Sequence, residues 1–148
     1  QRAQDSGLPD VDVQVLIYPV ADCDLDTESY LEFSEGFGLT RDSMAWFWQQ
    51  YLAEQDATQA GASPLRADSL AGLPPAYVVT AEYDILRDEG NAYAQRLEAA
   101  GVHVAWECVP GLLHGFMLHA DEIAEARAVI HRIGQFVKSG GVQAISDC

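Results

Sequence analysis

The chain has 148 residues, of which 49% are hydrophobic, and this is enough for one domain with a buried core rather than a disordered segment. Its 23 acidic and 8 basic residues give a net charge of −15, which repels nucleic acid and anionic membrane surfaces. No apolar run approaches the roughly 20 residues that cross a bilayer. We therefore expect no nucleic-acid or membrane partner. We also expect a cytoplasmic protein, although a truncated start could not show a signal peptide.

The first third of the chain predicts a loop, a strand and an acidic connection. Residues 1–10 are polar and are expected to form a loop, and residues 13–18 predict a parallel strand that ends at Pro19. The acidic residues that follow lack the Gly and Glu positions of a calcium-binding loop, so we expect a solvated loop. These residues are Asp22, Asp24, Asp26 and Glu28.

A helix with an aromatic side is predicted next. Thr40 is a suitable N-cap for a helix from Arg41 to about Glu54. An aromatic stripe at helical spacing is typical of a core-facing side rather than of a cofactor site. Its members are Met44, Phe47, Trp48, Tyr51 and Leu52. Residues 55–73 are rich in Ala, Gly and Ser, and we expect them to form a loop along the rim of the sheet.

The stretch from Pro74 to Gly90 is the most informative part of the chain. Residues 76–81 predict a strand buried on both faces, and Glu82 and Asp84 follow at its carboxyl end. Asp88 is the expected N-cap of a helix that ends at Gly101. Asp84 could serve chemistry at this edge, or it could merely order the turn before the helix.

A third strand is predicted over residues 102–109, and it leads into His114 between two glycine positions. A final helix from about Asp121 follows, with a buried stripe predicted at Ile123, Ala126, Ile130, Ile133 and Val137. Residues 1–138 are thus expected to form one unit and residues 139–148 a flexible tail. The order of elements predicts an α/β fold of about three parallel strands with flanking helices.

Asp84 and His114 each follow the carboxyl end of a predicted strand. Neighbouring parallel strands would bring them to the same rim, within hydrogen-bond reach. A carboxylate that orients an imidazole is the base half of a nucleophilic triad.

At these residues the sequence resembles the hormone-sensitive-lipase-like branch of the α/β-hydrolases, the bacterial carboxylesterases and acetyl esterases. The resemblance lies in Asp84 to Gly90, the following helix with Tyr93 to Leu97, and His114-Gly115-Phe116. Tyr18-Pro19 and Ser63-Pro64-Leu65 also match, so the similarity runs in order from about Val13 to Val137.

The resemblance implies a serine carboxylesterase with Asp84 as the triad acid and His114 as the general base. Leu86 and Phe116, each beside one of these residues, are candidates for the substrate pocket or for the core. Ile85 stands where the family commonly has Pro, a change remote from the chemistry. The expected substrate is a small-molecule ester, and no cofactor is expected.

The family's nucleophile motif, Gly-x-Ser-x-Gly, does not occur in the sequence. The resemblance therefore implies the C-terminal portion of a hydrolase, whose partner is the missing N-terminal part of the same protein. Alone, the chain is expected to be inactive and to associate with itself through an unpaired edge at residues 13–18. A non-catalytic ligand-binding protein on the same fold is the alternative. The reading frame upstream of Gln1 would separate the two, because only an esterase needs the Ser.

The cysteine and histidine residues predict neither a disulfide framework nor a metal site. Cys23, Cys108 and Cys148 are odd in number and widely spaced, and Cys108 is expected to be a small buried apolar residue. The remaining histidines, at 103, 119 and 131, lack the spacing of metal ligands. We expect no metal.

Overall fold

A computed structural model describes residues 11–53 and 55–142. The expected N-terminal loop at residues 1–10 and most of the expected tail, residues 143–148, lie outside the described residues. The described strands are β1 (Gln14–Ile17), β2 (Ala76–Tyr83) and β3 (Val104–Leu113), and they form one sheet in the order β1-β2-β3. Both pairings are parallel, which confirms the predicted α/β class of three parallel strands.

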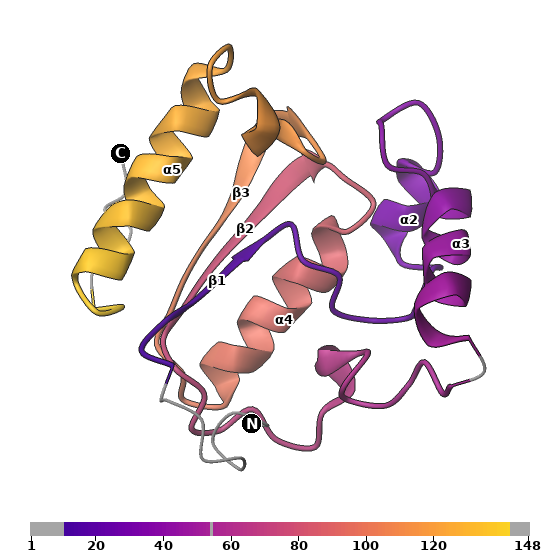
Figure 1. Ribbon diagram of the computed structural model, residues 1–148, viewed down its shortest axis with the longest axis horizontal. Coiled ribbons are helices and arrows are strands. Elements are labelled where there is room, and N and C mark those ends of the chain that lie inside the picture. The colour runs from indigo at the N-terminus through magenta and orange to yellow at the C-terminus, as the bar shows by residue number, and fades with distance from the viewer. Residues whose placement is uncertain (1–10, 54, 143–148) are drawn as a thin grey trace.

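Helices cover both faces of this sheet (Figure 1). The α-helices are α2 (Glu28–Glu32), α3 (Arg41–Leu52), α4 (Arg87–Ala99) and α5 (Ala124–Lys138), and two 3₁₀ turns are η1 (Pro64–Arg66) and η2 (Phe116–His119). Helix α4 lies on one face of the sheet and α5 on the other, while α2 and α3 lie together beyond the start of α4. Within the described ranges no helix is long and apolar enough to pass through a lipid bilayer.

The central strand β2 is buried on both sides, as its apolar run predicts. Ala76 and Val78 pack in a cluster with Leu97 of α4. Tyr77 and Val79 alternate with them and pack with residues of α5 on the opposite face. The two-residue period of the strand thus divides one apolar run between two helices.

The helix starts follow local hydrogen bonding. Thr40 caps α3 and forms a reciprocal capping box with Ser43, which confirms the predicted N-cap. The prediction of Asp88 as the N-cap of α4 is wrong, because α4 begins at Arg87 after Leu86. The carboxylate of Asp88 instead accepts the backbone N–H of Ser29, at 2.8 Å, and so ties α2 to α4.

The predicted apolar side of α5 is correct only in part, since Ala126 is buried and Ile123 and Ile133 pack against the core. The helix begins at Ala124, later than predicted, because residues 120–122 form a turn after η2. Ala126, Val129 and Phe136 are buried against the sheet, whereas Ile130 and Val137 are exposed. Both choices fit helical spacing, so the periodicity alone could not select the buried side.

Only part of the predicted aromatic stripe of α3 is buried in the core. Met44 and Leu52 are buried, whereas Phe47 and Tyr51 are exposed. Met44 packs in a cluster with Tyr30 of α2 and with Ile85 and Leu86 of the turn after β2. Phe47 and Tyr51 lie outside this cluster.

Gly90 allows α4 to approach β2 closely. A Cβ atom at Gly90 would lie 2.7 Å from Cγ2 of Thr80, a buried side chain whose hydroxyl donates to Asn91. We predict that Gly90→Ala destabilises the fold by about 1–3 kcal/mol, because the branched Thr80 side chain cannot move aside cheaply. Urea unfolding monitored by circular dichroism measures the change.

Gly134→Ala in α5 is the matched control. A Cβ atom there meets no atom within 4 Å, so the substitution should stabilise the helix by about 0.5–1 kcal/mol. Equal effects of the two substitutions would contradict a close approach of α4 to β2.

Candidate functional site

The predicted meeting of Asp84 and His114 occurs in the structure. Nδ1 of His114 lies 2.8 Å from Oδ2 of Asp84. Both strands extend further at their carboxyl ends than the sequence predicts. Tyr83 at the end of β2 pairs with Leu113 at the end of β3. Asp84 and His114 are the next residues along the two strands, so they leave the sheet side by side at its carboxyl rim.

Asp84 uses its two carboxylate oxygens for two different purposes. Oδ1 accepts the backbone N–H of Leu86 at 3.0 Å, which orders the turn into α4, and Oδ2 faces His114. The residue is only 1% exposed. The two interpretations of Asp84, turn former and partner of an imidazole, are therefore compatible, because one side chain serves both.

His114 meets Asp84 through one ring nitrogen only, and the other ring nitrogen points away from this contact. A carboxylate can only accept hydrogen bonds, so Nδ1 of His114 donates to Asp84 and Nε2 is left as the basic nitrogen. The side chain of His114 is 25% exposed, so the imidazole is accessible from one direction. Gly115, with φ of 82°, turns the chain directly after it.

Tyr18 lies against this pair, and sequence reasoning gave it no role. Its ring centroid is 4.4 Å from that of His114 and 5.8 Å from that of Phe116. Tyr18 has φ of 36°, an unusual value for a residue other than glycine. Burial, with a further contribution from the charge of Asp84, raises the pKa of the Tyr18 phenol. The signal available in the sequence was the Tyr-Pro pair after β1.

The two predicted pocket residues are buried in different clusters. Leu86 packs with residues of α2 and α3, and Phe116 packs with residues of β2 and α5. Each lies next to Asp84 or to the His114 loop along the chain. Contact with substrate stays a prediction for both.

Comparison with known protein families identifies the family to which this chain belongs. A family model described as alpha/beta hydrolase fold matches residues 1–118. The chain belongs to the α/β-hydrolase family.

Curated relatives of this α/β-hydrolase chain include ester hydrolases. It is 42% identical over 118 residues to carboxylic ester hydrolase LipN of Mycobacterium tuberculosis, covering 78% of this chain and 31% of the relative. It is 38% identical over 115 residues to ethyl acetate hydrolase of Pseudomonas putida, covering 77% and 36%. The chain thus spans about a third of the length of these two relatives.

Solved structures that are similar to this chain have the same fold. A thermostable esterase from Pseudomonas putida is 40% identical with a TM-score of 0.84, and the match covers 99% of this chain and 46% of that one. An esterase from Pyrobaculum calidifontis is 42% identical with a TM-score of 0.87, and here the match covers 95% and 47%. Both support the α/β-hydrolase fold for the described residues.

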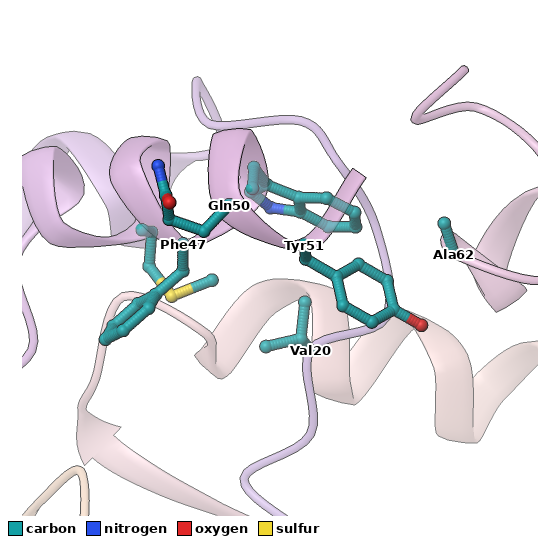
Figure 2. A pocket seen from close by; sticks show the side chains of 7 residues that line it. Val20, Phe47, Gln50, Tyr51 and Ala62 are labelled. Carbon is teal, nitrogen blue, oxygen red and sulfur yellow. The ribbon is translucent and has the colours of Figure 1, made fainter. Parts of the chain in front are cut away.

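An apolar cavity of about 550 Å³ lies beside α3 (Figure 2). Its lining residues are Val20, Met44, Phe47, Trp48, Gln50, Tyr51 and Ala62. Phe47 and Tyr51, two of the exposed aromatic side chains of α3, thus line a hollow. Val20 belongs to the same loop as Tyr18, two residues further along.

The acidic loop is only partly solvated, and it forms no metal centre. Asp22 is buried and accepts two hydrogen bonds from the guanidinium of Arg66, at 2.5 and 3.2 Å, contrary to the expected exposure. Across residues 11–53 and 55–142, no cluster of three His, Cys, Asp or Glu side chains could hold a metal ion. Cys108 is partly exposed rather than buried.

Glu89 is a buried carboxyl that the sequence did not indicate as special. Burial, together with the charges of Asp22 and Asp84, raises the pKa of Glu89 to about 8, against the lowering effect of two backbone N–H groups. Glu89 is therefore a neutral acid in the folded chain at pH 7. Tyr30 also lies in this region, and burial and the charge of Glu89 raise the pKa of its phenol.

Glu89 makes stability depend on pH. Below about pH 4.5 the carboxyl holds its proton in both the folded and the unfolded chain. Between about 4.5 and 8 the unfolded chain loses the proton and the folded chain keeps it, so the free energy of unfolding falls as pH rises. We predict that Glu89→Gln removes this contribution, at most about 1.4 kcal/mol per pH unit.

Urea unfolding of both proteins from pH 4 to 9 measures the contribution as a difference, in which the other titrating groups cancel. The stability of Glu89→Gln relative to the original chain should rise through this window and level off above pH 8. A difference independent of pH would contradict a neutral Glu89.

Proposed function

We propose that this chain supplies the acid and the base of a serine carboxylesterase. The observation that carries the proposal is the 2.8 Å contact between Nδ1 of His114 and Oδ2 of Asp84, at the carboxyl rim of two parallel strands. Membership of a family with esterase relatives of up to 42% identity supports it. A protein that only bound a ligand would have no need of such a pair.

In this mechanism His114 removes the proton of a serine hydroxyl through Nε2 while the serine attacks the ester carbonyl. Asp84 keeps the proton on Nδ1 and stabilises the imidazolium that forms. His114 then returns the proton to the leaving alcohol, and water repeats the cycle to release the acid. The burial of Asp84 makes its interaction with the imidazolium stronger than it would be in water.

The nucleophile and the oxyanion hole are proposed to lie in the rest of the protein, because the sequence has no Gly-x-Ser-x-Gly motif. The proposed substrates are small-molecule carboxylic esters. The apolar cavity beside α3 is large enough for one apolar substituent of such an ester. Cytoplasmic location and self-association of the isolated chain stay predictions.

The first prediction concerns the base. In the esterase that contains this chain, His114→Ala should lower kcat for a short acyl ester by about 10⁵–10⁶-fold, because nothing else takes the serine proton. Steady-state hydrolysis of p-nitrophenyl acetate measures the loss, and circular dichroism checks that the variant is folded. His131→Ala, at an exposed position of α5, is the control and should keep full turnover. Near-normal turnover by His114→Ala would exclude the proposed base.

The second prediction concerns the acid. Asp84→Asn should lower kcat by about 10⁴-fold, because the amide can donate to Nδ1 and favours the wrong imidazole tautomer. The amide oxygen can still accept the N–H of Leu86, so the turn should survive. Asp121→Asn, in an exposed turn, is the control for the same chemical change. A loss of less than tenfold in Asp84→Asn would remove Asp84 from the mechanism.

A further inference from the structure

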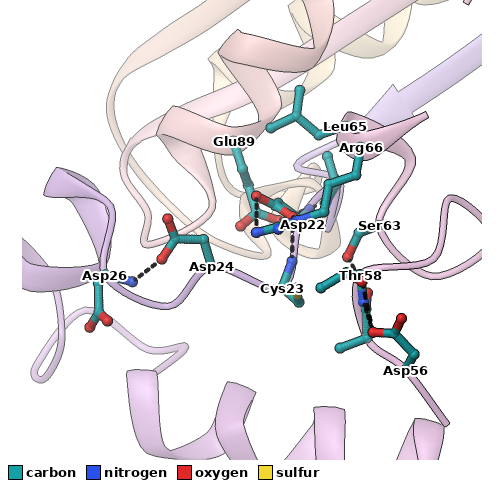
Figure 3. A network of polar contacts seen from close by, with 12 residues as sticks. Asp22, Cys23, Asp24, Asp26, Asp56, Thr58, Ser63, Leu65, Arg66 and Glu89 are labelled. Carbon is teal, nitrogen blue, oxygen red and sulfur yellow. Dashed lines mark hydrogen bonds and ion pairs between the residues drawn. The ribbon is translucent and has the colours of Figure 1, made fainter. Parts of the chain in front are cut away.

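Glu89 joins the first turn of α4 to the loop after β1. Its Oε1 accepts the backbone N–H of Ala21 at 2.7 Å and that of Asp22 at 3.4 Å. Figure 3 shows the Glu89 side chain reaching from α4 to the loop at Asp22, where Arg66 arrives from the other side. The loop is thus held by a side chain from a different element, 68 residues away from Ala21 in sequence.

The anchored loop carries the ring that covers His114. Tyr18 is held at one end, where its N–H donates to Val79 of β2 at 2.6 Å, and Ala21 is held at the other end by Glu89. Between them, Pro19 lies against the position of Gly90. The contact of the Tyr18 and His114 rings, at 4.4 Å between centroids, therefore depends on a loop fixed at both ends.

The buried carboxyl of Glu89 is satisfied on one oxygen only. Glu89 is 2% exposed, and its Oε2 has no hydrogen-bond partner among the described residues. Burying a carboxyl with one oxygen unsatisfied costs free energy, and the two backbone N–H groups that Oε1 accepts offset that cost. The groups that face it include Asp22 and Asp84, so a further negative charge here would be unfavourable.

We propose that Glu89 is a positioning residue, which holds the loop after β1 so that the Tyr18 ring stays against the imidazole of His114. The ring limits rotation of the imidazole and shields one of its faces from water, while Asp84 holds Nδ1. Glu89 touches no reacting group and acts through the loop. The catalytic consequence rests on the proposed esterase function, but the structural coupling of Glu89 to the Tyr18–His114 contact does not.

Nuclear magnetic resonance of the complete protein that contains this chain tests this coupling directly. The probe is the nuclear Overhauser effect between the ring protons of Tyr18 and His114, measured together with the ring-proton chemical shifts of His114. Glu89→Leu keeps the volume but removes the acceptor for Ala21, so the Overhauser effect should be lost and the His114 ring shifts should change. Glu89→Gln keeps a neutral acceptor and should preserve both signals.

Two further variants complete the experiment. Glu98→Leu, at an exposed position of the same helix, is the matched control and should leave both signals unchanged. Glu89→Asp retains the carboxyl but draws it back by one methylene, and it serves if Glu89→Leu does not fold. The Overhauser effect should weaken in Glu89→Asp, because the shorter side chain no longer reaches Ala21.

An unchanged Tyr18–His114 contact in folded Glu89→Leu or Glu89→Asp would overturn the proposal, and Glu89 would then be only a structural link. Loss of the contact in Glu89→Gln would also overturn it, because the acceptor is still present. These readouts need no turnover. An inactive complete enzyme that shows the predicted Overhauser changes would therefore count against the esterase function and in favour of the positioning role.

Discussion

The candidate site depends on the parallel pairing of β2 with β3. Because Tyr83 pairs with Leu113, the following residues, Asp84 and His114, leave two neighbouring strands at one rim and meet at 2.8 Å. This pairing, which resumes after an irregularity between Ala81 and Tyr83, brings together an imidazole and a carboxylate that are 30 residues apart in sequence. A slip of the pairing by one residue would turn the last side chains of the strand to the other face and separate the pair.

A second layer holds the acid loop in place around this rim. Ser29 of α2 donates its hydroxyl to the carbonyl of Ile85 at 2.7 Å, and its N–H donates to Asp88 at 2.8 Å. Asp88 and Glu89 are consecutive residues of α4, yet they bind different parts of the segment between β1 and α3. The first turn of α4 thus connects the strand that carries Asp84 with the loop that carries Tyr18.

The strands and the Asp84–His114 pair could be predicted from sequence, because buried runs and the polar residues after them are local patterns. The N-cap of α4 could not be, since Asp88 is engaged by Ser29, from a distant segment. The buried side of α5 was ambiguous because Ile130 and Val129 both fit a helical stripe. The burial of Glu89 and the ring contact of Tyr18 arise from tertiary packing, and no local pattern marks them.

The central claim is that Asp84 holds His114 as a base with its proton on Nδ1. The ¹⁵N chemical shifts of the His114 ring at neutral pH test it most directly, because protonated and unprotonated ring nitrogens differ widely in shift. We expect a protonated Nδ1 and an unprotonated Nε2, with Nδ1 responding to Asp84→Asn. An imidazole protonated on Nε2, or one exchanging freely between the two tautomers, would contradict it.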